Sequence, residues 1–421
     1  MVKLSSLALV FTFSCLVLLS CQTSKDSTPN LTTGIWRGII EVQGNELPFN
    51  FEVIQQVDSS YALNFINGEE KIYVDEVEIV DDSLFITMHI FDIEIRAKIK
   101  DRALTGIYKK NYLEDYVLPF KAQHGVSYRF EPSNQPASTD FGGKWSVTFV
   151  DEEGVKNESV GIFEERDGQL FGTFLTTTGD YRFLEGSVRG NEMALSTYDG
   201  NHAFLFKAKA LSEDSLKGDF WSGKTWHETW TAVRNDNASL PDANSLTYLK
   251  DGYDKISFSF PGLDGNLVSL DDEKYKNKVV LLQIFGTWCP NCMDETRFYA
   301  DWYRQNKERD IAIIGLAYEQ KDDFEYAKGR IEKMIKKLNV EYDYVVAGIS
   351  DKEEAAKTLP MLNHVLSYPT TIFLDKKGDV RRIHTGFTGP GTGVYYEQFV
   401  EDFNAFMELL LTEETDNHRS S

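Results

Sequence analysis

The segment that most constrains the fold is an apolar run followed at once by a Cys-Pro-Asn-Cys sequence. Residues 279–285 read Val-Val-Leu-Leu-Gln-Ile-Phe, which is typical of a strand buried on both faces of a parallel sheet. Residues 294–308 then carry aromatic side chains four positions apart, as on one face of a helix. Cys289 and Cys292 therefore lie where a strand passes into a helix, which indicates an α/β domain.

The remaining C-terminal patterns continue this alternation of strands and helices. We predict a second buried strand, an amphipathic helix, a hairpin and a last helix, over residues 311–317, 324–338, 370–384 and 399–410. Together they define an α/β domain over residues 250–411, with a linker over residues 236–249 and a flexible tail over residues 412–421.

The N-terminal half has a different pattern. Short runs of alternating apolar and polar residues are separated by turn signals such as Asn67-Gly68 and Asp199-Gly200. No helical period is evident there. This half therefore reads as antiparallel β-structure throughout.

The β-rich half also looks duplicated. Gly-Ile-Trp at residues 34–36 is matched by Gly-Lys-Trp at residues 143–145, and residues 103–106 are matched by residues 215–218, an offset of about 110 residues. We predict two similar antiparallel modules, each a small sandwich or barrel, over residues 31–130 and 141–235. Tryptophans in this half could line a ligand groove, but core or rim packing is the usual role of aromatic residues in strands: Trp36, Trp145, Trp221, Trp226 and Trp230.

The first residues read as a targeting segment. A positive Lys3 precedes an apolar stretch too short to span a bilayer comfortably, and the stretch ends Leu-Leu-Ser before Cys21. This ending resembles the lipobox of bacterial lipoproteins, in which the cysteine is acylated and becomes the mature N-terminus. We expect a signal peptide over residues 1–20 and a tether over residues 21–30. Gln22 after the cysteine favours the outer over the inner membrane, by the usual sorting rule.

Charge and cysteine usage narrow the choice of partners. The net charge is −22, and such a field repels nucleic acid and anionic lipid surfaces. We therefore expect contact with a membrane through the lipid anchor only. Of four cysteines, Cys15 falls in the signal peptide and Cys21 carries lipid, so the mature chain keeps only Cys289 and Cys292. The mature chain therefore does not use disulfide cross-links generally to stabilise its fold.

The position of the cysteine pair indicates thiol–disulfide exchange. A helix N-terminus presents free N–H groups and the positive end of its dipole to Cys289, which favours the thiolate, the nucleophile in exchange. Cys292 lies one turn deeper, where it can attack a mixed disulfide on Cys289. A zinc site would need further ligands that the seven histidines do not supply. A structural disulfide would close too short a loop to stabilise much. We expect neither a metal nor a cofactor.

Three segments resemble the TlpA-like family of thioredoxin-fold proteins. They are the Phe-Gly-Thr-Trp-Cys-Pro-Asn-Cys sequence at residues 285–292, the preceding run from Phe258 to Gly265, and Ser-Tyr-Pro-Thr-Thr-Ile-Phe at residues 367–373. The resemblance covers about residues 250–411 and leaves the β modules unassigned. It implies a thioredoxin-like fold and an oxidoreductase that acts on protein thiols and disulfides and receives electrons from an upstream thiol donor.

The resemblance also assigns site residues. Pro369 would follow a cis peptide bond and face the cysteines, and Trp288 and Tyr368 would join it in substrate binding. Glu295 matches a glutamate that some members use to handle protons, while an acid matched to the helix dipole is the alternative. Thioredoxin has a buried carboxylate where this chain has Gln283, and Gln cannot carry protons.

Two other functions compete with disulfide exchange. Peroxiredoxins share this fold and need a threonine three positions before the reactive cysteine, whereas Thr287 is two positions before Cys289. The chain could also be a non-catalytic binding protein that acts through its β modules. The residues favour an envelope thiol–disulfide oxidoreductase, lipid-anchored on the periplasmic side. They leave reductase, oxidase and isomerase open, because the direction depends on the reduction potential.

Overall fold

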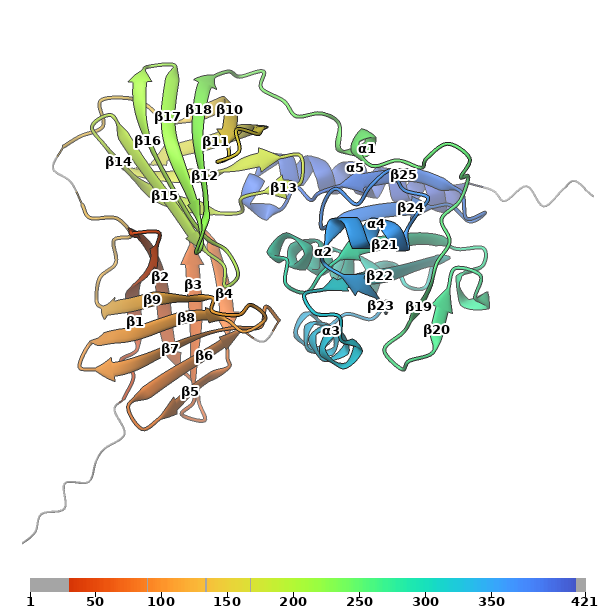
Figure 1. The fold of residues 1–421 in the computed structure, drawn as a ribbon, viewed down its shortest axis with the longest axis horizontal. Coiled ribbons are helices and arrows are strands. Elements are labelled where there is room, and N and C mark those ends of the chain that lie inside the picture. Colours follow the sequence, from red (N-terminus) through yellow and green to blue (C-terminus); the bar gives the residue numbers. More distant parts are fainter. Residues whose placement is uncertain (1–29, 89, 133–134, 167, 414–421) are drawn as a thin grey trace, which may run out of the picture.

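The computed structural model describes residues 30–413 except 89, 133–134 and 167. It contains two β barrels followed by an α/β domain, with both barrels on the same side of that domain (Figure 1). The predicted signal peptide with Cys15, and Cys21, the predicted acylation site, lie outside the described residues. Within the described ranges, no helix is long and apolar enough to cross a bilayer.

The first barrel is a nine-stranded antiparallel meander. Its order is β4-β3-β2-β1-β9-β8-β7-β6-β5, and it is near-closed because β3 and β4 approach β5 and β6. Alternate side chains of β2, including Phe49 and Phe51, fill its interior. The strands are Gly34–Val42 (β1), Asn45–Gln55 (β2), Tyr61–Asn67 (β3), Glu70–Val74 (β4), Val77–Val80 (β5), Ser83–Met88 (β6), Ile93–Lys100 (β7), Ala103–Lys110 (β8) and Val117–His124 (β9).

The second barrel repeats this architecture and closes fully. Its order is β11-β10-β18-β17-β16-β15-β14-β12-β13, and β11 also pairs with β12. The strands are Gly143–Val150 (β10), Lys156–Arg166 (β11), Gln169–Thr176 (β12), Gly179–Asp180 (β13), Leu184–Arg189 (β14), Glu192–Tyr198 (β15), Ala203–Ser212 (β16), Ser215–Ser222 (β17) and Trp226–Arg234 (β18).

The predicted duplication is present in three dimensions. Trp36 and Trp145 occupy equivalent places at the start of the two barrels, and both are fully buried. Each donates its indole N–H to a backbone carbonyl four residues earlier, that of Thr32 at 2.8 Å and that of Phe141 at 3.0 Å. Trp230 is also core, whereas Trp226 is half exposed at the mouth of the second barrel.

The C-terminal domain is built on a five-stranded sheet of order β23-β22-β21-β24-β25. Strands β23, β22 and β21 are parallel to one another, and β24 is antiparallel to both of its neighbours, β21 and β25. The sheet strands are Val279–Phe285 (β21), Ile311–Glu319 (β22), Asp343–Ile349 (β23), Thr370–Leu374 (β24) and Val380–Thr385 (β25), with a small hairpin, Ser259–Pro261 (β19) and Leu267–Ser269 (β20), before them.

In the part of the chain that the structure describes, five α-helices accompany these sheets: Ala243–Leu246 (α1), Pro290–Asn306 (α2), Phe324–Leu338 (α3), Lys352–Thr358 (α4) and Val394–Thr412 (α5). Helix α2 begins four residues earlier than its aromatic spacing predicts. Phe298 and Trp302 of α2 pack against Phe403 of α5, with ring centroids 4.9 and 5.2 Å apart.

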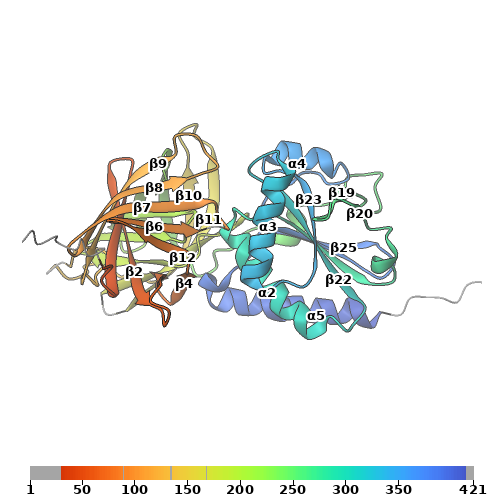
Figure 2. The same ribbon diagram turned by 90° about the horizontal axis from the view of Figure 1, so that it is seen from below.

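Helix α2 starts on the side of the C-terminal domain that faces the barrels (Figures 1 and 2). The β12–β13 hairpin reaches across to it, since Asn291 in the first turn of α2 donates to the carbonyl of Asp180 at 3.0 Å. The first barrel also contacts this domain, because Tyr326 and Arg330 of α3 both reach Asp92. The cysteine pair therefore lies at a junction between the barrels and the α/β domain.

Candidate active site

Cys289 caps the N-terminus of α2. Its Sγ accepts a hydrogen bond from the backbone N–H of Cys292 at 3.2 Å. It also lies 3.4 Å from the carbonyl oxygen of Tyr368, to which its S–H can donate. Pro290 occupies the first helical position, where its missing N–H costs nothing. Cys289 is 6% exposed, and it lines the cleft between the second barrel and the C-terminal domain.

Cys292 lies one turn deeper and is fully buried. Burial raises the pKa of its thiol well above the usual range, and the neighbouring Cys289 sulfur adds to the shift. Both cysteines are free thiols in this structure. The two sulfurs are therefore unequal: one borders a cleft, and the other is held protonated behind it.

Glu295 is buried on the same side of α2 as Cys292. Its carboxylate accepts from Gln283 Nε2 at 2.8 Å, from Tyr299 at 3.2 Å and from Thr371 at 3.0 Å. Burial raises the pKa of Glu295 to about 7, although these three hydrogen bonds oppose the shift. Gln283, which cannot itself carry a proton, thus holds a carboxyl group that titrates near neutrality.

A second buried carboxyl, Glu319, lies at the end of β22. It accepts from the backbone N–H of Thr287 at 2.9 Å and from the Thr287 hydroxyl at 2.8 Å, two residues before Cys289. Burial raises the pKa of Glu319 to about 7. The apolar pattern predicts a strand that ends at Ala317, whereas β22 continues through Glu319, so Glu319 was not among the predicted site residues.

The loop before β24 forms the opposite side of the cysteine pair. The peptide bond between Tyr368 and Pro369 is cis. The ring of Trp288 meets that of Tyr368 edge-on, with centroids 5.5 Å apart, and the Trp288 indole donates to the carbonyl of Tyr318 at 2.9 Å. Trp288 and Tyr368 therefore flank Cys289 on the wall of the cleft.

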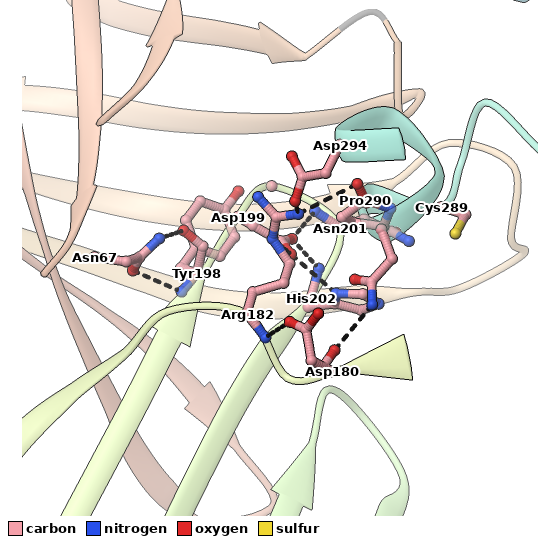
Figure 3. A network of polar contacts seen from close by, with 12 residues as sticks. Asn67, Asp180, Arg182, Tyr198, Asp199, Asn201, His202, Cys289, Pro290 and Asp294 are labelled. Atoms are coloured by element: carbon pink, nitrogen blue, oxygen red, sulfur yellow. Dashed lines mark hydrogen bonds and ion pairs between the residues drawn. The ribbon is translucent and has the colours of Figure 1, made fainter. Parts of the chain in front are cut away.

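The second barrel holds the backbone on both sides of Cys289 (Figure 3). Asn201 Nδ2 donates to the carbonyl of Trp288 at 2.7 Å, and Arg182 Nη1 donates to the carbonyl of Pro290 at 3.2 Å. Together with the hydrogen bond between Asn291 and Asp180, these contacts hold residues 288–291, the segment around Cys289, at three points. None of these barrel residues was predicted, because Asp199-Gly200 reads only as a turn and Arg182 carries no local signal.

Arg182 is also the centre of a buried ionic cluster. Its guanidinium bonds Asp294 of α2 and Glu70 of the first barrel, and lies 3.3 Å from Asp199 of its own barrel. Burial favours loss of its charge, but the carboxylates, Asp294 foremost, outweigh burial and raise the pKa of Arg182. Burial raises the pKa of Glu70, and raises that of Asp180 to about 6. One side chain thus joins both barrels to the helix that carries the cysteines.

The structure brings together all six residues that the sequence singled out in the C-terminal domain: Trp288, Cys289, Cys292, Glu295, Tyr368 and Pro369. Among the residues that the structure describes, no group of three or more His, Cys, Asp or Glu side chains is arranged to hold a metal ion. The chemistry of this site is that of two thiols, two buried carboxyls and an aromatic cleft.

Comparisons with known proteins match the same domain. Residues 252–383 match the AhpC/TSA family. The thioredoxin-like protein YneN of Bacillus subtilis is 28% identical over 138 residues, which is 33% of this chain and 73% of that protein. The thiol-disulfide oxidoreductase ResA of Bacillus thuringiensis is 27% identical over 129 residues, which is 31% of this chain and 66% of that protein.

Solved structures align with a little over a third of the chain. A thioredoxin-family thiol:disulfide interchange protein from Chlorobium tepidum covers 38% of this chain and 99% of its own, with 19% identity and a TM-score of 0.29. A thiol-disulfide oxidoreductase from Bacteroides fragilis covers 35% and 99%, with 25% identity and a TM-score of 0.26.

Fold, cysteine pair and relatives together define a thioredoxin-fold protein. More narrowly, the C-terminal domain is similar to the TlpA-like, AhpC/TSA-related family over about a third of the chain, and its fold, cysteine pair and relatives are those of a thiol–disulfide oxidoreductase.

Proposed function

We propose that this oxidoreductase works through Cys289 and Cys292 on disulfides of exported proteins in the bacterial cell envelope. The observation that carries the proposal is the hydrogen bond from the Cys292 N–H to Cys289 Sγ at 3.2 Å, on a sulfur that borders a cleft. A backbone donor at a helix N-terminus stabilises negative charge on that sulfur. The buried Cys292 thiol lies behind it as the resolving group.

The reaction follows in two exchanges. The Cys289 thiolate attacks one sulfur of a substrate disulfide, the substrate S–S bond breaks, and the other substrate sulfur leaves as a thiolate. Cys292 then loses its proton and attacks Cys289 Sγ, which releases the second substrate sulfur and closes the Cys289–Cys292 disulfide. Two electrons have passed to the substrate, and an upstream dithiol donor restores the enzyme.

Glu295 is the proposed proton carrier for Cys292. It lies on the same face of α2, and its charge contributes to the raised pKa of Cys292. A carboxyl group with a pKa of about 7 can both accept and return a proton near neutral pH. The peroxidase alternative fits less well, because the Thr287 hydroxyl is bonded to Glu319.

The chromogenic reagent 5,5′-dithiobis(2-nitrobenzoate) tests the proposal directly. The reduced wild-type protein should release two thionitrobenzoate ions per reagent molecule as its own disulfide forms, and Cys289→Ser should lose the fast phase. Undiminished fast release by Cys289→Ser would place the reactive thiol elsewhere. The reduction potential of the pair then sets the direction, since a value near that of thioredoxin, about −270 mV, identifies a reductase and one near −120 mV an oxidant.

The proposed location rests on the Leu-Leu-Ser-Cys sequence that ends at Cys21. Acylation there would tether the mature chain to a membrane, with the outer membrane favoured by Gln22. The full-length protein should partition into detergent and incorporate labelled fatty acid, and Cys21→Ser should become soluble. Detergent partitioning that survives Cys21→Ser would rule out this anchor.

A further inference from the structure

The cysteine pair opens into a cleft whose far wall belongs to the second barrel. The cleft has a volume of about 690 Å³ and runs from Cys289, Trp288 and Tyr368 to Phe204 and Trp226 of the barrel. It falls in the range of sites that enclose a ligand rather than a single water. Its walls carry aromatic side chains together with charges of both signs, from Lys352 of α4 to Glu228 of β18.

One edge of the cleft is a strand that lacks a partner on one side. Strand β11 pairs with β10 from Lys156 to Phe163, but its pairing with β12 begins only at Val160. Among the strands of the described residues, none pairs with residues 156–159 on the β12 side. These four residues line the cleft, and Lys156, Asn157 and Glu158 are exposed.

Strand alternation shows which backbone groups are free. The pair Arg166 and Gln169 closes the β11–β12 hairpin, and in an antiparallel ladder every second residue bonds to the same neighbour. Even-numbered residues of β11 therefore direct their N–H and C=O groups toward β12. At Lys156 and Glu158 that neighbour is missing, so these groups point into the cleft.

Residues 156–159 of β11 have no neighbour on this side because the chain at the end of β12 turns away from β11 and contacts the C-terminal domain. Ser367 donates to the carbonyl of Thr178 at 2.7 Å, and the backbone N–H of Gly389 donates to Asp180 Oδ2 at 2.7 Å. A Cβ on Gly179 would lie 2.6 Å from Asn291 Nδ2, so the two chains are in close contact there. The hairpin that leaves β11 unpaired is the same one that holds the segment around Cys289.

We propose that this cleft binds an extended polypeptide segment of the substrate, which adds as a strand to residues 156–159 of β11 and presents its disulfide to Cys289. The proposal rests on the proposed function and adds a substrate class to it. Free N–H and C=O groups on a strand edge are a template for main-chain pairing. The aromatic walls would contact alternate side chains of the bound segment.

The recognition is of backbone rather than of charge. Lys156 and Lys352 face the cleft with Glu158 and Glu228, so neither sign of substrate is selected. An unfolded or partly unfolded exported chain can lay an extended segment along this edge, because its backbone N–H and C=O groups are not already paired. A small disulfide would reach Cys289 without touching β11. The second barrel is thereby part of the substrate site.

A proline on the β11 edge tests this pairing. Glu158→Pro removes one outward N–H and leaves the β10 ladder intact, since proline is tolerated on edge strands. Glu158→Ala keeps the N–H. Lys71→Pro is the matched control, because Lys71 lies on the exposed edge strand β4 of the first barrel, away from the cleft. The substrates are a ten-residue peptide with a central cysteine joined to thionitrobenzoate, and 5,5′-dithiobis(2-nitrobenzoate) itself.

The measured quantity is the ratio of kcat/KM for the peptide to kcat/KM for the small reagent. Glu158→Pro should lower this ratio by about 2- to 10-fold, the loss expected for one main-chain hydrogen bond. Glu158→Ala should lower it less, and Lys71→Pro should leave it at the wild-type value. If Glu158→Pro does not fold, Lys156→Pro replaces it, because Lys156 also directs its N–H into the cleft. The peptide N-methylated at alternate positions should be a poorer substrate of the wild-type protein.

The outcomes separate the two proposals. An unchanged ratio in a folded β11 proline variant overturns the strand pairing, as does an equal fall in Lys71→Pro. Equal loss with peptide and small reagent would instead identify a general effect on the cysteine pair. Failure of the wild-type protein to react with either substrate would count against the proposed function itself.

Discussion

Asn201 of the second barrel donates a hydrogen bond of 2.7 Å to the carbonyl oxygen of Trp288, the residue before Cys289. The contact joins residues 87 positions apart in the chain. Arg182 holds the carbonyl of Pro290 from the same barrel. The segment that carries Cys289 is therefore held from outside the thioredoxin-like domain, so the second barrel helps to set the geometry of the proposed active site.

Removing this contact should slow the reaction of Cys289. Asn201→Ala frees the Trp288 carbonyl, and the lost hydrogen bond should lower the rate constant with a small disulfide by up to about 10-fold. Stopped-flow release of thionitrobenzoate measures it. Asn191→Ala is the control, since Asn191 bonds the carbonyl of Ala210 within the same barrel. If Asn201→Ala and Asn191→Ala react with the small disulfide at equal rates, Asn201 does not position Cys289.

Arg182 should be among the most sensitive positions for stability. Arg182→Met leaves Asp294, Asp199 and Glu70 buried without their common cation, and breaking a buried pair typically costs about 3–5 kcal/mol. The free energy of unfolding in urea should fall by this amount at pH 8. The loss should shrink at pH 5, because burial already raises the pKa of Glu70 and the removal of Arg182 lets Glu70 take up a proton as the pH falls.

Arg166→Met provides the matched comparison. Arg166 lies in the same barrel and pairs with Glu69 and Glu164, but all three side chains are largely exposed. Exposed pairs contribute about 0–1 kcal/mol, so this variant should stay close to the wild-type protein. An equal loss of unfolding free energy in both variants would mean that the buried cluster contributes no more to stability than an exposed ion pair.

Glu319 should impose a pH dependence on stability. Burial raises its pKa from 4.5 to about 7, so the folded state prefers the protonated carboxyl. The free energy of unfolding should therefore fall as the pH rises from about 4.5 to about 7, by roughly 3 kcal/mol at 1.36 kcal/mol per pKa unit. Glu319→Gln has no carboxyl group to titrate at this position, so its free energy of unfolding should not fall in this way. Relative to the wild-type protein, Glu319→Gln should therefore become more stable as the pH rises from 5 to 8.

Urea titrations of both proteins at the two pH values measure that difference. Glu319→Gln also alters the hydrogen bonds from Thr287. That effect should change the free energy of unfolding equally at pH 5 and pH 8, so it cancels when the two pH values are compared. Glu353→Gln, at an exposed acid in the first turn of α4, should change little. A constant difference between Glu319→Gln and wild type across this range would show that Glu319 does not titrate there.

Glu295 should control the pH profile of exchange. If it carries the proton of Cys292, Glu295→Gln should slow single-turnover exchange by about 10²–10⁴-fold and flatten its pH dependence near pH 7. The dipole-matching alternative does not apply, because Glu295 is fully buried and lies beyond the first turn of α2. If Glu295 serves only as a buried hydrogen-bond acceptor, Glu295→Gln should alter stability and leave the rate unchanged. Rates measured from pH 5 to pH 9 separate the two, and an unaltered profile would remove Glu295 from the mechanism.

The sequence predicted those features that local spacing determines. A buried strand followed by a helix places Cys289 at a helix N-terminus, and a spacing of three residues puts Cys292 and Glu295 on one face. The repeat of Gly-x-Trp predicted two similar β modules, and left sandwich or barrel open. Closure depends on the pairing of β11 with β12, which alternation along a single strand does not specify.

The features that the sequence missed are those that depend on packing between distant segments. Arg182 and Asn201 look like ordinary polar residues near turns until the second barrel is placed against α2. Glu319 was missed for another reason: a carboxylate at the end of an apolar run reads as a strand terminus. Here two hydrogen bonds from Thr287 let the strand continue through it.

Trapping of a mixed disulfide distinguishes the proposed roles of the two cysteines, attack by Cys289 and resolution by Cys292. Cys292→Ser removes the group that releases substrate, so it should accumulate a mixed disulfide with a cysteine-containing protein substrate. Mass spectrometry of the digested adduct should locate that bond at Cys289, and Cys289→Ser should trap nothing. Adducts formed through Cys292 in Cys289→Ser, with none in Cys292→Ser, would reverse the assignment and contradict the account.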